Sequence, residues 1–146
     1  KTSRCVVATG SVVFKLQSVC PGLDVANGTI HHGGYGRARP ELLAIVRSTR
    51  VRVTRARAWT DIATTYARED DHRQAAEAYR RAYRAAPGTS ASHNALFALG
   101  QMRLSLNESD AAAQVFREYV FVAPEGALSS RARRSLCTLG DREYCP

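Results

Sequence analysis

Residues 58–87 read AWTDIATTYAREDDHRQAAEAYRRAYRAAP, and the spacing of their apolar side chains predicts two consecutive helices. Large and small residues three or four positions apart would share one face of the first helix; they are Trp59, Ile62, Ala63 and Tyr66. The segment REDD breaks this spacing, and Asp71 with Gln74 three residues later is typical of the start of a second helix. Pro87 followed by Gly88 predicts where that helix ends. The stretch therefore predicts a helical hairpin.

The same order of large residues, small residues and prolines returns 37 residues further along the chain, as expected for a repeat protein. Equivalent residues have similar sizes: Trp59 and Leu96, Ile62 and Leu99, Ala63 and Gly100, Ala75 and Ala112, Tyr79 and Phe116, Pro87 and Pro124. Two pairs are dissimilar: Tyr66 with Arg103, and Ala82 with Tyr119. A third unit begins after Pro124, with Leu136 in the place of Leu99. The sequence therefore predicts five helices over 56–139, as two hairpins and a capping helix.

These residues resemble the tetratricopeptide repeat. In the first unit the family's aromatic, small and proline positions are filled by Trp59, Ala63, Tyr66, Ala75, Tyr79, Ala82 and Pro87. In the second unit the matching residues are Leu96, Gly100, Ala112, Phe116 and Pro124, whereas Arg103 and Tyr119 depart. The resemblance covers 58–146 and implies a mainly α fold of antiparallel hairpins, with units over 58–88 and 93–125 and a capping helix over 127–139.

Repeats of this family bind a peptide or a partner helix on a concave face that the first helix of each hairpin lines. The resemblance therefore implies a partner-binding role for eight residues: Arg57, Thr60, Thr64, Ala67, Asn94, Phe97, Gln101 and Leu104. We expect Phe97 to be an exposed apolar anchor, because on a helix it points about 100° away from the core residue Leu96. The alternative is that Phe97 packs against the preceding repeat.

A narrower resemblance concerns residues 95–136, ALFALGQMRLSLNESDAAAQVFREYVFVAPEGALSSRARRSL. They are similar to the tandem repeats of bacterial envelope proteins, in which ALG opens a repeat and a P-x-G-x-L-type link joins the next. This resemblance implies a partner within a multi-subunit envelope complex. No apolar run approaches the roughly 18 residues that a membrane-spanning helix needs, so we expect no transmembrane segment.

The first 57 residues differ from the rest in charge, with 10 Lys+Arg against 2 Asp+Glu, whereas residues 58–146 hold 11 of each. Residues 1–39 predict a small β-rich or irregular segment, or the end of a truncated module, and 40–57 predict a linking helix or strand. Pro40 would lie in the first turn of that helix, and 51–53 would form a strand. A degenerate helical repeat is the alternative, with Leu42 and Ile45 facing inward.

The basic first third also offers an alternative function, because a cluster of arginines can bind nucleic acid or an anionic surface. The simpler interpretation is a solvated basic face, since no aromatic platform or nucleic-acid-binding motif accompanies the arginines. We therefore expect a protein or peptide partner rather than nucleic acid.

The four cysteines form two local pairs, Cys5 with Cys20 and Cys137 with Cys145. Three pairings are possible for four cysteines, and sequence proximity favours the local ones. Disulfides would place the protein in an oxidising compartment, the periplasm or the cell exterior. The alternative for Cys137 is a buried free thiol.

A histidine and glycine-rich stretch, HHGGYG at 31–36, is the strongest candidate for chemistry in the sequence. Adjacent histidines on a strand point to opposite sides, and the glycines lack the spacing of phosphate-binding or dinucleotide-binding loops. The cysteine spacing does not fit a zinc site, and no nucleophile motif or catalytic triad is present. We therefore expect a non-enzymatic adaptor or scaffold subunit without a cofactor or a metal ion.

Overall fold

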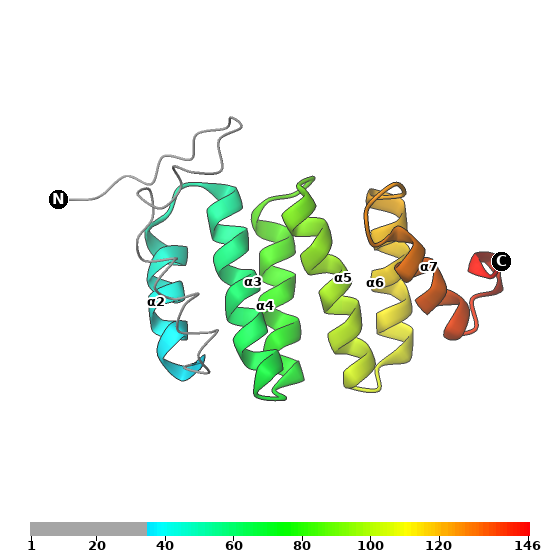
Figure 1. Ribbon diagram of the computed structural model, residues 1–146, viewed down its shortest axis with the longest axis horizontal. Helices are drawn as coiled ribbons and strands as arrows, with labels where there is room; N and C mark the ends of the chain where they lie inside the picture. The colour runs from blue at the N-terminus through cyan, green and yellow to red at the C-terminus, as the bar shows by residue number, and fades with distance from the viewer. Residues whose placement is uncertain (1–34) are drawn as a thin grey trace.

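The computed structural model describes residues 35–146, which form a row of stacked helices (Figure 1). The helices are α2 (Tyr35–Ser48), α3 (Arg52–Arg68), α4 (His72–Ala85), α5 (Ser90–Ser105), α6 (Ser109–Val122) and α7 (Ser129–Thr138), and a short 3-10 helix, η2 (Arg142–Tyr144), follows them. No strand occurs among the described residues. The prediction of a mainly α fold is confirmed for this part of the chain.

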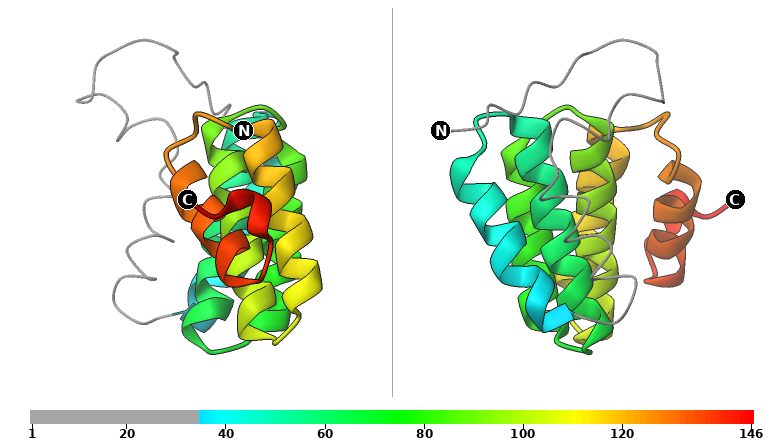
Figure 2. Two further views of the ribbon diagram at one scale, coloured as in Figure 1. Left: turned by 90° about the vertical axis from the view of Figure 1, so that its right-hand side faces the viewer. Right: turned by 60° about the vertical axis from the view of Figure 1, so that its left-hand side comes forward.

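Each helix contacts the next one along the chain, so that α3 and α4 form one hairpin and α5 and α6 form another. The α3 helix also contacts α5, which brings the first helices of the two hairpins together. The end-on view in Figure 2 shows α7 and the C-terminal turn in front of the hairpins, at the end of the stack. The five helices predicted over 56–139 are therefore α3 to α7.

Small residues set how closely the helices of each hairpin approach. Ala63, Ala75 and Ala82 are fully buried in the first hairpin. In the second hairpin, Gly100 takes the place of Ala63 because a Cβ atom there would lie 2.6 Å from Cε1 of the buried Phe116. The large ring and the missing side chain are therefore complementary.

The repeat extends to the backbone of the turns. Asp70 and Asn107, which are 37 residues apart, adopt the left-handed conformation with φ of 60° and 61°. In both turns the backbone N–H of the following residue donates to a carbonyl near the end of the first helix. Asp71 donates to Tyr66, and Glu108 donates to Arg103. Arg103 also forms an ion pair with Glu108 across its turn, which accounts for a charged residue in the place of the aromatic Tyr66.

The α7 helix continues the 37-residue register on its buried face. Its three buried residues are equivalent to buried residues of α5: Ser129 to Ser92, Ala132 to Ala95, and Leu136 to Leu99. It ends early because Gly140, with φ of 93°, adopts the left-handed conformation and reverses the chain. The helix is therefore a shortened first helix of a third unit.

The α2 helix corrects two predictions. It begins at Tyr35, so residues 35–39 are helical and Pro40 lies inside the helix rather than in its first turn. Contacts across the stack favour this earlier start: Ala38 is fully buried, and Arg39 forms an ion pair with Glu69 at 2.6 Å. Local sequence patterns do not reveal the ion pair, because Glu69 follows Arg39 by 30 residues.

The strand predicted over 51–53 is also wrong. Val51 precedes α3, and the next two residues begin that helix, which buries Thr54 and Ala58 on one side and Ala56 on the opposite side. Leu42 is buried and Ile45 packs against the core, as the alternative of a degenerate helical repeat predicts. The predictions for Cys5, Cys20, the β-rich segment before residue 35 and most of the HHGGYG stretch lie outside the described residues.

Candidate binding face

The first helices α3, α5 and α7 carry equivalent residues in three rows, which we call the first-helix face. Within a row, successive residues are 37 positions apart in the sequence. The rows are Arg57, Asn94 and Arg131; Thr60, Phe97 and Arg134; and Thr64, Gln101 and Thr138. Ala67 and Leu104 begin a fourth row, which α7 is too short to complete. The sequence prediction included the α3 and α5 residues and missed those of α7. One further application of the same register would have found them.

The side chains of this face differ in their exposure. The exposed side chains are those of Arg57, Asn94, Arg131, Arg134 and Thr138. Those that are half-buried are Thr60, Thr64, Ala67, Gln101 and Leu104. Only Phe97 among the residues of the first-helix face is buried. The surface is therefore polar, with small apolar contacts at its fourth row.

The two threonines that α3 contributes to the first-helix face already use their hydroxyl protons. Thr60 Oγ1 donates to the Ala56 carbonyl at 3.0 Å, and Thr64 Oγ1 donates to the Thr60 carbonyl at 3.0 Å. Thr64 Oγ1 also lies 3.4 Å from the hydroxyl of Tyr79, which ties it to α4. These residues therefore shape the surface, while the longer side chains of α5 and α7 offer hydrogen-bonding groups.

Phe97 is not the exposed anchor that its position on the helix predicts. Only 5% of the residue is accessible, and its ring lies 5.4 Å from that of Phe116 and 5.9 Å from that of Tyr119. The guanidinium of Arg131 covers it from α7, 5.1 Å from the ring centroid. The prediction that Phe97 is exposed is wrong because Phe116, Tyr119 and the α7 helix enclose its ring. A buried ring cannot serve as the exposed anchor for a partner.

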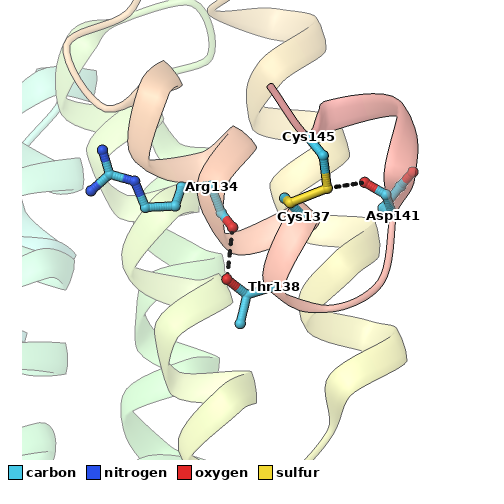
Figure 3. Close-up of a disulfide and its surroundings, with 5 residues drawn as sticks. All are labelled: Arg134, Cys137, Thr138, Asp141 and Cys145. Atoms are coloured by element: carbon cyan, nitrogen blue, oxygen red, sulfur yellow. Dashed lines mark hydrogen bonds between the residues drawn. A yellow bond between two sulfur atoms is a disulfide. The ribbon is translucent and has the colours of Figure 1, made fainter.

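Three arginines of the first-helix face form no ion pair among the described residues: Arg57, Arg131 and Arg134. By contrast, Arg80 and Arg81 both pair with Glu77 on α4, and these guanidiniums outweigh the effect of burial and lower the pKa of Glu77. Figure 3 shows Arg134 on the side of α7 away from the Cys137–Cys145 bridge. The first-helix face is therefore a basic surface.

A disulfide closes the chain after α7. The structure joins Cys137 to Cys145, the pair that sequence proximity favours, with Cα atoms 4.9 Å apart (Figure 3). Arg117 of α6 holds the same tail through an ion pair with Asp141 at 2.7 Å. The disulfide and the ion pair therefore tie the residues that follow α7 to α7 and α6.

Over residues 35–146, no group of three or more histidine, cysteine, aspartate or glutamate side chains is arranged to hold a metal ion. None of the helices in this range combines the length and the apolar character needed to cross a membrane. The chemistry that the first-helix face offers is mainly hydrogen bonding and charge.

A comparison with protein families matches residues 56–89 to the tetratricopeptide repeat. The matched residues cover most of α3, all of α4 and the link to α5. A comparison with curated proteins finds no match to the chain. The family match therefore coincides with the hairpin whose sequence carries the complete set of repeat residues.

Proposed function

We propose that this tetratricopeptide-like helical repeat protein is a non-enzymatic adaptor that binds a segment of a partner protein on its first-helix face. Tetratricopeptide repeats generally mediate protein–protein interaction, which supports the proposal. The observation that carries it is the continuity of the face. The α3 helix contacts α5, and Arg131 of α7 lies over Phe97 of α5, so that the three equivalent helices are linked along the stack.

The side chains on α5 suit recognition of a peptide backbone. Asn94 and Gln101 each carry an amide that can donate and accept hydrogen bonds, and they lie two helical turns apart. Leu104 and Ala67 are half-buried and offer apolar contacts at one edge of the surface. A segment lying across the three helices would meet polar groups along its backbone and an apolar contact at its side.

The adaptor works, in this proposal, in the periplasm or outside the cell, as part of a bacterial envelope complex. The joined Cys137 and Cys145 support an oxidising compartment, because such bonds persist there and are rare in the cytosol. The resemblance of residues 95–136 to envelope repeats supports the complex. A multi-subunit assembly would use the face as one docking point among several.

Selection from a display library of random 16-residue peptides, with the full chain as bait, tests this function. The affinity of selected peptides is then measured for the wild type, for Gln101→Ala on α5 and for the matched Gln114→Ala on α6. We expect Gln101→Ala to weaken binding about fivefold, the value of one lost hydrogen bond, and Gln114→Ala to change nothing. Equal effects of both substitutions would contradict the proposal. Binding that needs residues 1–57 and collapses with salt would favour the basic first third instead.

A further inference from the structure

The first-helix face carries an unbalanced positive charge. Its three arginines, Arg57, Arg131 and Arg134, are exposed, and none of its residues is acidic. The α5 and α7 helices contain no aspartate or glutamate, and α3 contains only Asp61, which already has an interaction partner. The other acidic residues of the repeats lie in the turns, as in the segment 69–71, or on the second helices, as Glu77 and Glu118 do.

Resting on the proposed function, we propose that the partner segment is acidic, and that Arg131 and Arg134 bind its carboxylates with Arg57 as a third, more distant contact. Arg131 and Arg134 are three residues apart on α7, which is a rise of about 4.5 Å along one side of the helix. Two acidic side chains of one peptide can reach both guanidiniums. Charge complementarity thus selects an acidic protein segment.

The aromatic ring beneath Arg131 prepares it for this role. The guanidinium lies 5.1 Å from the Phe97 centroid, where the electron-rich face of the ring attracts a cation. This contact consumes none of its N–H groups, and the guanidinium has no hydrogen bond or ion pair among the described residues. An arginine that is already ordered loses less conformational freedom when a carboxylate binds to two of its N–H groups.

Two arginines outside the first-helix face serve as a control for Arg131 and Arg134. Arg73 and Arg84 on α4 are also exposed, and they too lack an ion pair within residues 35–146, but they lie on a second helix. Removing either pair of arginines changes the net charge of the chain equally. A difference between the two pairs therefore reports position rather than total charge.

The experiment uses the full chain and a fluorescein-labelled 12-residue peptide of alternating glutamate and alanine, with a glutamine and alanine peptide as the neutral control. Anisotropy titrations compare the wild type with Arg131→Gln/Arg134→Gln and with Arg73→Gln/Arg84→Gln. We expect the acidic peptide to bind the wild type, the α7 double variant to bind it about tenfold more weakly and the α4 double variant to stay within about twofold. The neutral peptide should bind none of them measurably.

Arg134→Gln alone is the second test, because the Arg134 side chain forms no ion pair or cation–π contact within residues 35–146, whereas Arg131 covers Phe97. Its folding is checked by circular dichroism, and we expect about a threefold loss of affinity. Equal losses in the α4 and α7 double variants, or no binding to the wild type, would overturn the inference. Selected library peptides that need Gln101 but contain no excess of acidic residues would overturn it while leaving the proposed function standing. Peptides insensitive to Gln101→Ala would contradict the proposed function itself.

Discussion

The hydroxyl of Tyr119, near the end of α6, accepts a hydrogen bond from the backbone N–H of Leu128 at 3.2 Å. This bond ties α6 to the residue before α7, and the ring of the same tyrosine is buried against Phe97. Tyr119 stands where the first repeat has the small Ala82. The departure from the family pattern therefore serves the junction with the shortened third unit.

Tyr119→Ala, which restores the small residue of the family, should destabilise this chain. It removes a fully buried ring, so we expect the free energy of unfolding to fall by about 3 kcal/mol or more. Tyr119→Phe keeps the ring and loses only the bond to Leu128, which costs about 1 kcal/mol. Urea denaturation measures both. A neutral effect of Tyr119→Ala would mean that the second repeat packs like the first.

Gly100→Ala should destabilise the second hairpin. Its Cβ would lie 2.6 Å from Cε1 and 2.8 Å from Cζ of Phe116, which is fully buried and cannot move away freely. The expected overpacking cost of about 1–3 kcal/mol exceeds the gain of about 0.5–1 kcal/mol from replacing glycine in a helix. Gly36→Ala in α2 is the control, since its Cβ meets nothing within 4 Å. Thermal melts should show a lower melting temperature for Gly100→Ala only.

High pH should weaken the contact between α4 and α6. Burial and the hydrogen bond to Glu118, 2.8 Å long, raise the pKa of Tyr83 from 10.0 to about 12. The unfolded chain therefore loses this proton first, so the stability that the neutral tyrosine contributes is present below pH 10 and is lost as the pH rises toward 12. Denaturation at a series of pH values should show a fall in this window that Tyr83→Phe reduces. An identical fall in that variant would assign the effect to other groups.

Reduction of the bond between Cys137 and Cys145 should loosen the C-terminal end and spare the first hairpin. Protein isolated without reductant should show no free thiol at either position in alkylation and peptide mapping. Cys145→Ser should lower the free energy of unfolding by about 2–3 kcal/mol. Faster hydrogen exchange should appear in α7 and leave α3 and α4 unchanged. Free thiols in the native protein would remove the main support for an oxidising compartment.

The hairpins could be predicted from the sequence because the periodic spacing of large and small residues within each helix indicates which face packs. The alternation of large and small residues fixes a helix face, and the recurrence of that pattern at 37 residues fixes the number of units. The cap formed when Asp71 accepts the N–H of Gln74, at 3.1 Å, follows from residue types three positions apart. Local signals of this kind need no knowledge of distant contacts.

The environment of Phe97 could not be predicted in this way. Periodicity gives the direction of a side chain around its own helix, but not what the next helix places over it. Arg131 is 34 residues away in the sequence, and only the packing of α7 in the folded chain brings it over the ring. The start of α2 could not be predicted for the same reason, because Arg39 contacts Glu69, which is distant in the sequence.

Binding of a partner on the first-helix face is tested most directly by mapping backbone amide shifts in NMR spectra when a selected library peptide is added to the full chain. We predict that the largest changes fall on α3, α5 and α7, around Asn94, Gln101 and Arg134. Changes that concentrate on α4 and α6, or within residues 1–57, would contradict a binding surface formed by the first helices.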